Sequence, residues 1–256
     1  MKKTTIQKYR PLYLLTIGIV FLLRYFSKVT DSDVINWMLA PTVRWAGILS
    51  GISFEYLPHQ GYASHSYCFL VAPSCSGIRF MTISFLMLTS SLYRIEKKAA
   101  GYLWFGFSAV FSYITTILVN SLRIIAAIHL PLLLKRAGLM NGWLTPDRLH
   151  TLIGTTVYFS SLCVLYLLAS AVCGRWFLYD DKENAQKSDA FSASVPVFWY
   201  LLIVLILPFG KRLLTNNWNG FGQYALLILC SCFPITAILR LRRAPAGRTG
   251  KTAVKP

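Results

Sequence analysis

The chain has 256 residues, of which 55% are hydrophobic and only 14% are charged, and its formal net charge is +17 at pH 7. Several apolar runs reach the roughly 20 residues needed to cross a hydrocarbon core of about 30 Å. This composition excludes an ordinary soluble domain and predicts a polytopic membrane protein. The basic residues lie at the chain ends and in short loops. They form no stripe interleaved with aromatic residues, so we predict no nucleic-acid partner and take the lipid bilayer as the surroundings of the chain.

The apolar runs predict an all-α membrane bundle of about six transmembrane helices plus one interfacial or re-entrant helix. In chain order, the predicted spans are 11–28, 76–93, 100–122, 151–173, 195–209 and 223–239. The first span follows a basic N-terminus, as a signal peptide does, but no small-residue cleavage site precedes Arg24, so we interpret it as uncleaved. Residues 124–130 prolong the third apolar run, and Pro131 is expected to end or kink that helix.

The segment 34–54, between the first two spans, predicts the additional helix. It is apolar over 34–49 but contains Pro41 and Arg44 and is flanked by acidic residues. This pattern favours an interfacial or re-entrant helix, and a full crossing, which would reverse the parity of the spans, stays open as the alternative.

Two histidines follow that segment, His59 and His65. We interpret them as surface loop residues. A metal site with Cys68 is the alternative, but the spacing matches no strong ligand motif. We therefore predict no metal and no cofactor.

Polar segments separate the later spans. The segment 180–189 follows the fourth span, and a loop over 211–222 joins the fifth to the sixth. Residues 1–239 are predicted to form a single transmembrane domain, and residues 240–256 a basic, disordered tail. Six spans place both termini on one side, and most of the Lys and Arg residues outside the spans lie on that side. Both termini and the tail are therefore predicted to be cytoplasmic.

Three polar residues fall at one depth of this topology: Cys75, Arg123 and His150. Each lies about 28 to 37 Å, at about 1.5 Å per helical residue, from the cytoplasmic basic residue at the other end of its span. All three are therefore expected near the outer interface, at the ends of three different spans.

The three residue types suit acyl transfer. A thiolate is a strong nucleophile that a neighbouring cation favours, a histidine can move protons to and from leaving and entering groups, and an arginine can stabilise an oxyanion. Each residue also has a plainer interpretation: the cysteine as a small apolar filler, the arginine as an anchor and the histidine as an interfacial residue.

Four further residues are candidates for supporting roles. Asp147 lies three residues before the histidine and orients the imidazole if that stretch is helical. Asn120 lies three residues before the arginine and can fix it or bind substrate. The backbone amides of Ser76 and Gly77, at the start of the second span, are candidate oxyanion donors because helix N-termini favour negative charge.

Three stretches around these residues resemble the exosortase/archaeosortase family of membrane enzymes. They are Ser-Cys-Ser-Gly-Ile at 74–78, Asn-Ser-Leu-Arg-Ile at 120–124, and His150 followed by Gly154. Residues 39–41, 51–55 and 61–62 are similar to the lead-in of that family, so the resemblance covers roughly 35–160. The chain departs from the pattern at Arg79, where the family would have Asn.

The resemblance implies a membrane-embedded cysteine protease or transpeptidase. Cys75 would be the nucleophile, Arg123 would stabilise the oxyanion or substrate, and His150 would be the acid and base. The substrates implied are membrane-anchored proteins with a C-terminal sorting signal, cleaved through a thioester at the outer face of a bacterial or archaeal cytoplasmic membrane. The implied acceptor is a polysaccharide or a lipid-linked glycan. A compact chain with no appended soluble domain fits the exosortase K type.

Two other function classes stay open. A small transporter or channel for an anionic solute would use Arg24, Arg79 and Arg123, but it needs polar residues at mid-membrane depth, and the last three predicted spans have almost none. A structural or assembly subunit is the third possibility, and abnormal reactivity of Cys75 would argue against it.

Overall fold

The computed structural model describes residues 7–26, 28, 31–95, 97–139, 144–176, 195–215, 218 and 220–241. Most of these residues are helical, as the sequence predicts. The helices are α2 (Arg10–Phe26), α3 (Asn36–Ser50), α4 (Ile78–Ser90), α5 (Lys98–Arg136), α6 (Pro146–Trp176), α8 (Val195–Leu201), α9 (Leu207–Thr215) and α10 (Phe221–Leu241). A π-helical turn, Leu202–Ile206, joins α8 to α9.

Four helical stretches of the described chain are long and apolar enough to cross a membrane. They are Pro73–Tyr93, Lys98–Arg136, Pro146–Val172 and Val195–Thr215, and they match predicted spans two to five. The helices at the positions of spans one and six are shorter, since α2 has 17 residues and the apolar part of α10 is Phe221–Ala237.

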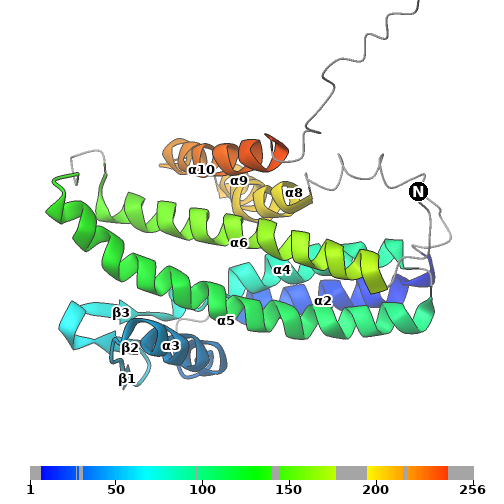
Figure 1. Ribbon diagram of the computed structural model, residues 1–256, viewed down its shortest axis with the longest axis horizontal. Coiled ribbons are helices and arrows are strands. Elements are labelled where there is room, and N and C mark those ends of the chain that lie inside the picture. Colours follow the sequence, from blue (N-terminus) through cyan, green and yellow to red (C-terminus); the bar gives the residue numbers. More distant parts are fainter. Residues whose placement is uncertain are drawn as a thin grey trace, which may run out of the picture.

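Figure 1 shows how the helices are arranged. The long helices α5 and α6 run side by side along the longest axis, with α2 and α4 beside them. Helix α3 and the small sheet cover one side of α5, whereas α8, α9 and α10 lie on the opposite side of the molecule, against α6. The chain thus forms three layers, and its candidate residues lie where α4, α5 and α6 meet.

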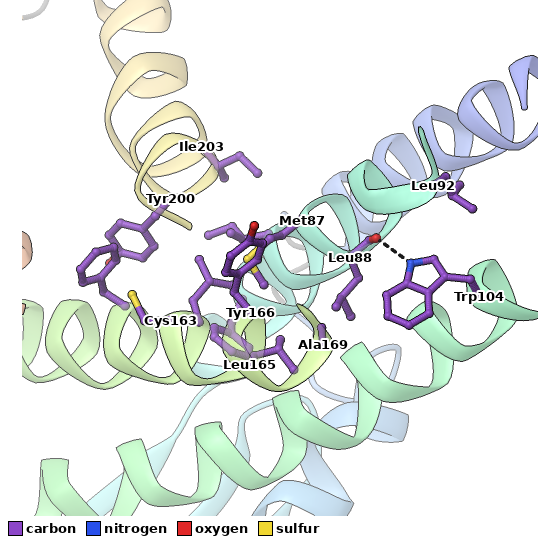
Figure 2. Close-up of a cluster of buried hydrophobic side chains, with 14 of the residues drawn as sticks. Met87, Leu88, Leu92, Trp104, Cys163, Leu165, Tyr166, Ala169, Tyr200 and Ile203 are labelled. Carbon is purple, nitrogen blue, oxygen red and sulfur yellow. Dashed lines mark hydrogen bonds between the residues drawn. The ribbon is translucent and has the colours of Figure 1, made fainter. Parts of the chain in front are cut away.

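The larger hydrophobic core lies between α4, α6 and the α8–α10 layer (Figure 2). Met87, Tyr166 and Tyr200 are buried there, and the indole of Trp104 donates a hydrogen bond of 3.0 Å to the Leu88 carbonyl. In lipid, close packing and interhelical hydrogen bonds of this kind hold helices together, because burial of apolar surface from lipid yields little.

Small polar residues form a buried stripe along α5. Ser108, Ser112, Thr116 and Asn120 recur every fourth residue and are completely buried. The three hydroxyls donate to carbonyls of their own helix, as in the 2.6 Å bond from Thr116 to Ser112. Their small volume lets neighbouring helices approach α5 closely. The stripe ends at Asn120, whose amide bonds to the segment before α4.

A three-stranded antiparallel sheet follows α3. Its strands are β1 (Glu55–Leu57), β2 (Gly61–Ser64) and β3 (Phe69–Val71), in the order β1-β2-β3. Gly61 has a φ of 125°, and a Cβ there would lie 2.2 Å from the Val71 carbonyl oxygen, so the close strand pairing needs glycine. His59 lies in the β1–β2 turn and His65 in a 3-10 turn, and both are exposed, as predicted for surface residues. The strands around them were not predicted, so the described part of the chain is not purely helical.

Of the two outcomes predicted at Pro131, a helix end or a kink, the structure has the kink, whereas the predicted end of the fifth span was wrong. Helix α5 continues past Pro131 to Arg136, with a bend toward its C-terminal end (Figure 1), so the proline kinks the helix rather than ending it. The fifth span continues past Pro208 to Thr215, which shortens the loop predicted over 211–222. Pro208 lies in the first turn of α9, directly after the π-helical turn, where the hydrogen-bond pattern already departs from that of a regular α-helix.

The predicted tail differs at its start, since α10 includes residues 240 and 241. The rest of the tail, 242–256, and the polar segment 180–189 lie outside the described residues. The segment 34–54 forms α3, whose 15 residues are about 22 Å long at 1.5 Å per residue and are shorter than a span.

Candidate active site

Cys75 ends a single 3-10 turn, Pro73–Cys75, directly before α4. The Cys75 amide donates to the Ala72 carbonyl (2.8 Å), and the Ser76 amide donates to the Pro73 carbonyl (3.1 Å). Gly77 then takes a φ of 79° and begins α4. The turn, which we call the cysteine turn, therefore holds the half-buried Cys75 thiol just before the N-terminus of α4.

Gly77 is required where α4 meets α5. A Cβ at this position would lie 3.0 Å from the Asn120 side-chain carbon Cγ and 3.0 Å from the Thr116 methyl group. A side chain would also be strained at this positive φ. Glycine thus brings the cysteine turn into contact with the polar stripe of α5.

Asn120 fixes the backbone of the cysteine turn. Its Nδ2 donates a 2.6 Å hydrogen bond to the Cys75 carbonyl oxygen, and its Oδ1 accepts a 2.6 Å hydrogen bond from the Tyr158 hydroxyl. The side chain is fully buried, so both partners are needed to satisfy the amide.

Arg123 connects the other groups of the site. Its Nη1 donates to the Tyr158 hydroxyl (3.1 Å) and its Nη2 donates to His150 Nε2 (2.8 Å). The guanidinium lies 5.2 Å from the centre of the Tyr158 ring and within electrostatic reach of the Cys75 side chain. A thiol from the cysteine turn and an imidazole and a phenol from α6 thus meet around one permanent cation.

The Arg123 Nε is buried and has no hydrogen-bond partner among the described residues. It lies against Gly154, where a Cβ would be 3.3 Å away, so a larger residue would push the guanidinium out of place. A buried donor without an acceptor is costly, and an oxygen atom supplied by a bound molecule would satisfy it.

His150 lies in the second turn of α6 and is exposed. Because a guanidinium can only donate, Nε2 must be the acceptor, so this arrangement assigns the proton of the neutral ring to Nδ1. Asp147 lies one turn earlier and exerts an electrostatic effect on the ring. No hydrogen bond between these two side chains occurs in the described part of the chain, so the orienting role of Asp147 stays a prediction.

A cavity of about 130 Å³ opens beside these groups. Its lining combines the cysteine turn with the two cations and the phenol: Pro73, Ser74, Ser76, Gly77, Ile78, Arg79, Arg123 and Tyr158. Since the Ser76 amide already has an acceptor, Gly77 is the better placed of the two predicted oxyanion donors. The oxyanion-donor roles of the Ser76 and Gly77 amides stay predictions.

Six of the seven predicted residues converge in the structure: Cys75, Ser76, Gly77, Asn120, Arg123 and His150. Tyr158 was missed, although its hydroxyl joins the asparagine to the arginine. The available signal was spacing, since His150, Gly154 and Tyr158 are four residues apart and share one face of α6. An aromatic residue in an apolar helix did not stand out by itself.

A second polar cluster lies at the sheet, away from the cysteine. Asp31, Asp33 and His59 bring ligand-type atoms within 4.8 Å of one another. His59 pairs with both carboxylates, at 3.2 and 3.3 Å, and the Tyr56 hydroxyl donates to Asp33. Hydrogen bonding to Asp31, aided by both carboxylate charges, raises the pKa of His59, and the bond from Tyr56 lowers the pKa of Asp33. The cluster ties the β1–β2 turn to the segment before α3.

No protein-family model matches the chain, and neither a curated protein nor a solved structure is similar to it.

Proposed function

We propose that the chain is a membrane-embedded cysteine peptidase and transpeptidase of the exosortase/archaeosortase type. The observation that carries this proposal is the contact between Arg123 and His150 within electrostatic reach of Cys75, beside one small cavity that Arg123 and the cysteine turn line. Arginine and histidine are rare in apolar helices unless they have a function, and here they contact each other beside a thiol. The motif resemblance names the same three residues independently.

The proposed topology has six spans, with α2 and α10 added to the four long apolar stretches. The distribution of Lys and Arg residues favours cytoplasmic termini. The end of α5 and the start of α6 then lie outside, so the active site faces the outer surface of a bacterial or archaeal cytoplasmic membrane. Helix α3 and the sheet lie at that same end, beside the C-terminal half of α5 (Figure 1).

The proposed reaction is acyl transfer. The Cys75 sulfur attacks the scissile carbonyl of a C-terminal sorting signal. Arg123 Nη2 leaves His150 Nε2 and turns to the developing oxyanion, so that Nε2 can take the thiol proton and pass it to the leaving amine. Arg123 stabilises the oxyanion of the tetrahedral intermediate, which an arginine can do without losing its charge. The C–N bond breaks and a thioester to Cys75 remains. A nucleophile of a surface acceptor, a polysaccharide or a lipid-linked glycan, then attacks the thioester and frees the thiol.

Asn120 and Tyr158 act as positioning residues in this proposal. The asparagine fixes the carbonyl of the nucleophile's own residue, and the tyrosine fixes the arginine. Such rigid support is valuable because a displacement of about 1 Å can lower the rate of an oriented reaction about 100-fold.

Removal of the thiol tests the proposal. Cells that express Cys75→Ala at the normal membrane level should accumulate uncleaved surface proteins with their C-terminal anchors, as measured by mass spectrometry of membrane proteins. Cys68→Ala is the matched control, because Cys68 is an exposed thiol of the same outer region that lies after the 3-10 turn His65–Tyr67 and outside the cysteine turn. Normal processing in the Cys75→Ala strain would contradict the proposal.

A further inference from the structure

A second cavity, of about 350 Å³, lies next to the cavity beside the cysteine turn and shares Arg79 with it. Arg24, from the last turn of α2, and Lys28, just beyond that helix, supply two more cations. The remaining lining is Ile203, Val204, Leu207, Pro208 and Tyr224. We call this space the basic cavity.

Three positive charges thus converge on the basic cavity, and none of the described residues that line it is acidic. Arg79 lines both cavities, and its charge also acts on the hydroxyls of Tyr158 and Tyr224. Cations that face one space repel each other, and an anion in that space would relieve the repulsion. Arginine binds phosphate oxygens especially well, because its planar fork donates two parallel hydrogen bonds.

The apolar part of the lining comes mostly from Val195–Thr215, the least buried of the candidate spans, with Tyr224 added by α10. Only 12% of the most apolar stretch of Val195–Thr215 is buried, and Ile206 and Leu207 are 51% and 47% exposed. In a bilayer this surface faces lipid, so the basic cavity has a charged side and a lipid-facing side. An amphiphile can enter it laterally with its head group on the cations and its tail against α9.

The basic cavity and the Cys75 thiol lie at the same depth in the proposed membrane. Arg24 lies near the C-terminal end of α2 and Arg79 near the N-terminal end of α4, four residues after Cys75. In the proposed topology both ends lie at the outer interface, where phospholipid head groups are found.

We propose that the basic cavity binds the phosphate-bearing head group of a membrane amphiphile, and that a phosphomonoester or a diphosphate fits it best. A phosphomonoester carries about −1.5 to −2 charges at pH 7, which matches three cations better than a carboxylate or a phosphodiester with a single charge. This inference rests on the proposed membrane placement. A phosphorylated lipid would then lie next to the site of Cys75. The lipid-linked acceptor would accordingly be a phosphorylated amphiphile.

Lipid binding to the full-length protein in neutral detergent tests the inference. Short-chain phosphatidic acid is the probe, and phosphatidylglycerol and phosphatidylcholine with the same acyl chains are the comparisons, each titrated by calorimetry or native mass spectrometry. Phosphatidic acid should bind most tightly, and Lys28→Gln, Arg24→Gln and Arg79→Gln should each weaken it about tenfold, since each removes a charge-assisted contact.

Two variants serve as controls. Arg44→Gln removes an exposed cation of the same outer region that does not line the basic cavity, and it should bind the probe like the unmodified protein. Cys75→Ala should also bind phosphatidic acid normally, because Cys75 does not line the basic cavity. The two proposals can therefore fail independently. Normal processing in Cys75→Ala contradicts the peptidase, and loss of the expected lipid preference contradicts the head-group site.

Three results would overturn the inference. Equal binding of phosphatidylcholine and phosphatidic acid would exclude a head-group site. Unchanged affinity in Lys28→Gln, which alters an exposed side chain and should leave the fold intact, together with unchanged affinity in the two arginine variants, would place the lipid elsewhere. Inorganic pyrophosphate that binds as tightly as phosphatidic acid would show a site for a soluble anion.

Discussion

At the scale of single residues, the Tyr158 hydroxyl is the link on which the candidate site depends. It donates to Asn120 and accepts from Arg123, while its ring packs 5.2 Å from that of Phe80. A phenol in this position orders an amide and a guanidinium at the same time. The arginine of the proposed active site therefore has a fixed position before any substrate binds.

Tyr158→Phe should keep the aromatic ring but lose the hydroxyl that joins Asn120 to Arg123. We expect a loss of about 1–2 kcal/mol in the free energy of unfolding, because a buried amide oxygen and a guanidinium N–H lose a partner. Processing of surface proteins should fall further than stability explains. Denaturation in detergent and mass spectrometry of the substrates measure the two effects.

Tyr166→Phe is the matched control. Tyr166 lies eight residues later in α6, and its buried hydroxyl has no hydrogen-bond partner within the described residues. Its removal should leave stability and processing nearly unchanged. Equal effects of the two substitutions would refute the linking role of Tyr158.

At the scale of elements, the start of α4 depends on one glycine. Gly77→Ala should destabilise the protein by about 1–3 kcal/mol, since it adds strain at positive φ to a close contact with Asn120. Gly51→Ala separates the two causes, because Gly51 has a φ of 70° but a Cβ added there would meet nothing within 4 Å. Thermal unfolding should therefore show a larger loss for Gly77→Ala, and an equal loss would show that the contact with α5 is unimportant.

The β1–β2 turn should respond to pH through His59 and Asp33. The raised pKa of His59 means that its contribution is complete below pH 6.5 and is lost as the pH rises through the higher, folded-state pKa. The lowered pKa of Asp33 means that its contribution is complete above pH 3.8 and is lost as the pH falls through the lower one. The turn should therefore be docked most firmly between these two limits.

Amide hydrogen exchange over residues 55–64, corrected for intrinsic rates, measures this docking. His59→Gln should abolish the change above pH 6.5, whereas His65→Gln should retain it, because His65 pairs with Glu55 and not with the carboxylates before α3. A pH response that survives His59→Gln would assign the effect to another group.

The sequence predicted the long helices well and the sheet not at all. An apolar run of 20 residues is unambiguous, but strands of three or four residues are too short to show an alternating pattern. Cys75, Arg123 and His150 could be found because all three lie at the ends of apolar runs and are residue types that suit acyl transfer. Tyr158 did not stand out, since it is one of 14 tyrosines and its link to Asn120 and Arg123 appears only when α5 lies beside α6.

At the scale of the whole molecule, the orientation in the membrane is testable with two cysteines. Cys68 of the sheet and Cys75 should both react with a membrane-impermeant maleimide added to intact cells or spheroplasts, because both lie at the predicted outer end. Cys68 is exposed and serves as the accessible reference. Labelling of Cys68 only after the membrane is opened would place the sheet and the thiol inside the cell.

The central claim is that Cys75 forms a thioester with a cleaved surface protein. The most direct test isolates the protein from its own membranes after a rapid acid quench, which protonates competing nucleophiles and preserves a thioester, and identifies the attached fragment by mass spectrometry. We predict a single Cys75 adduct that neutral hydroxylamine releases and that Cys75→Ala lacks. No acyl adduct on Cys75, in quenched cells whose surface proteins are being processed normally, would contradict the claim.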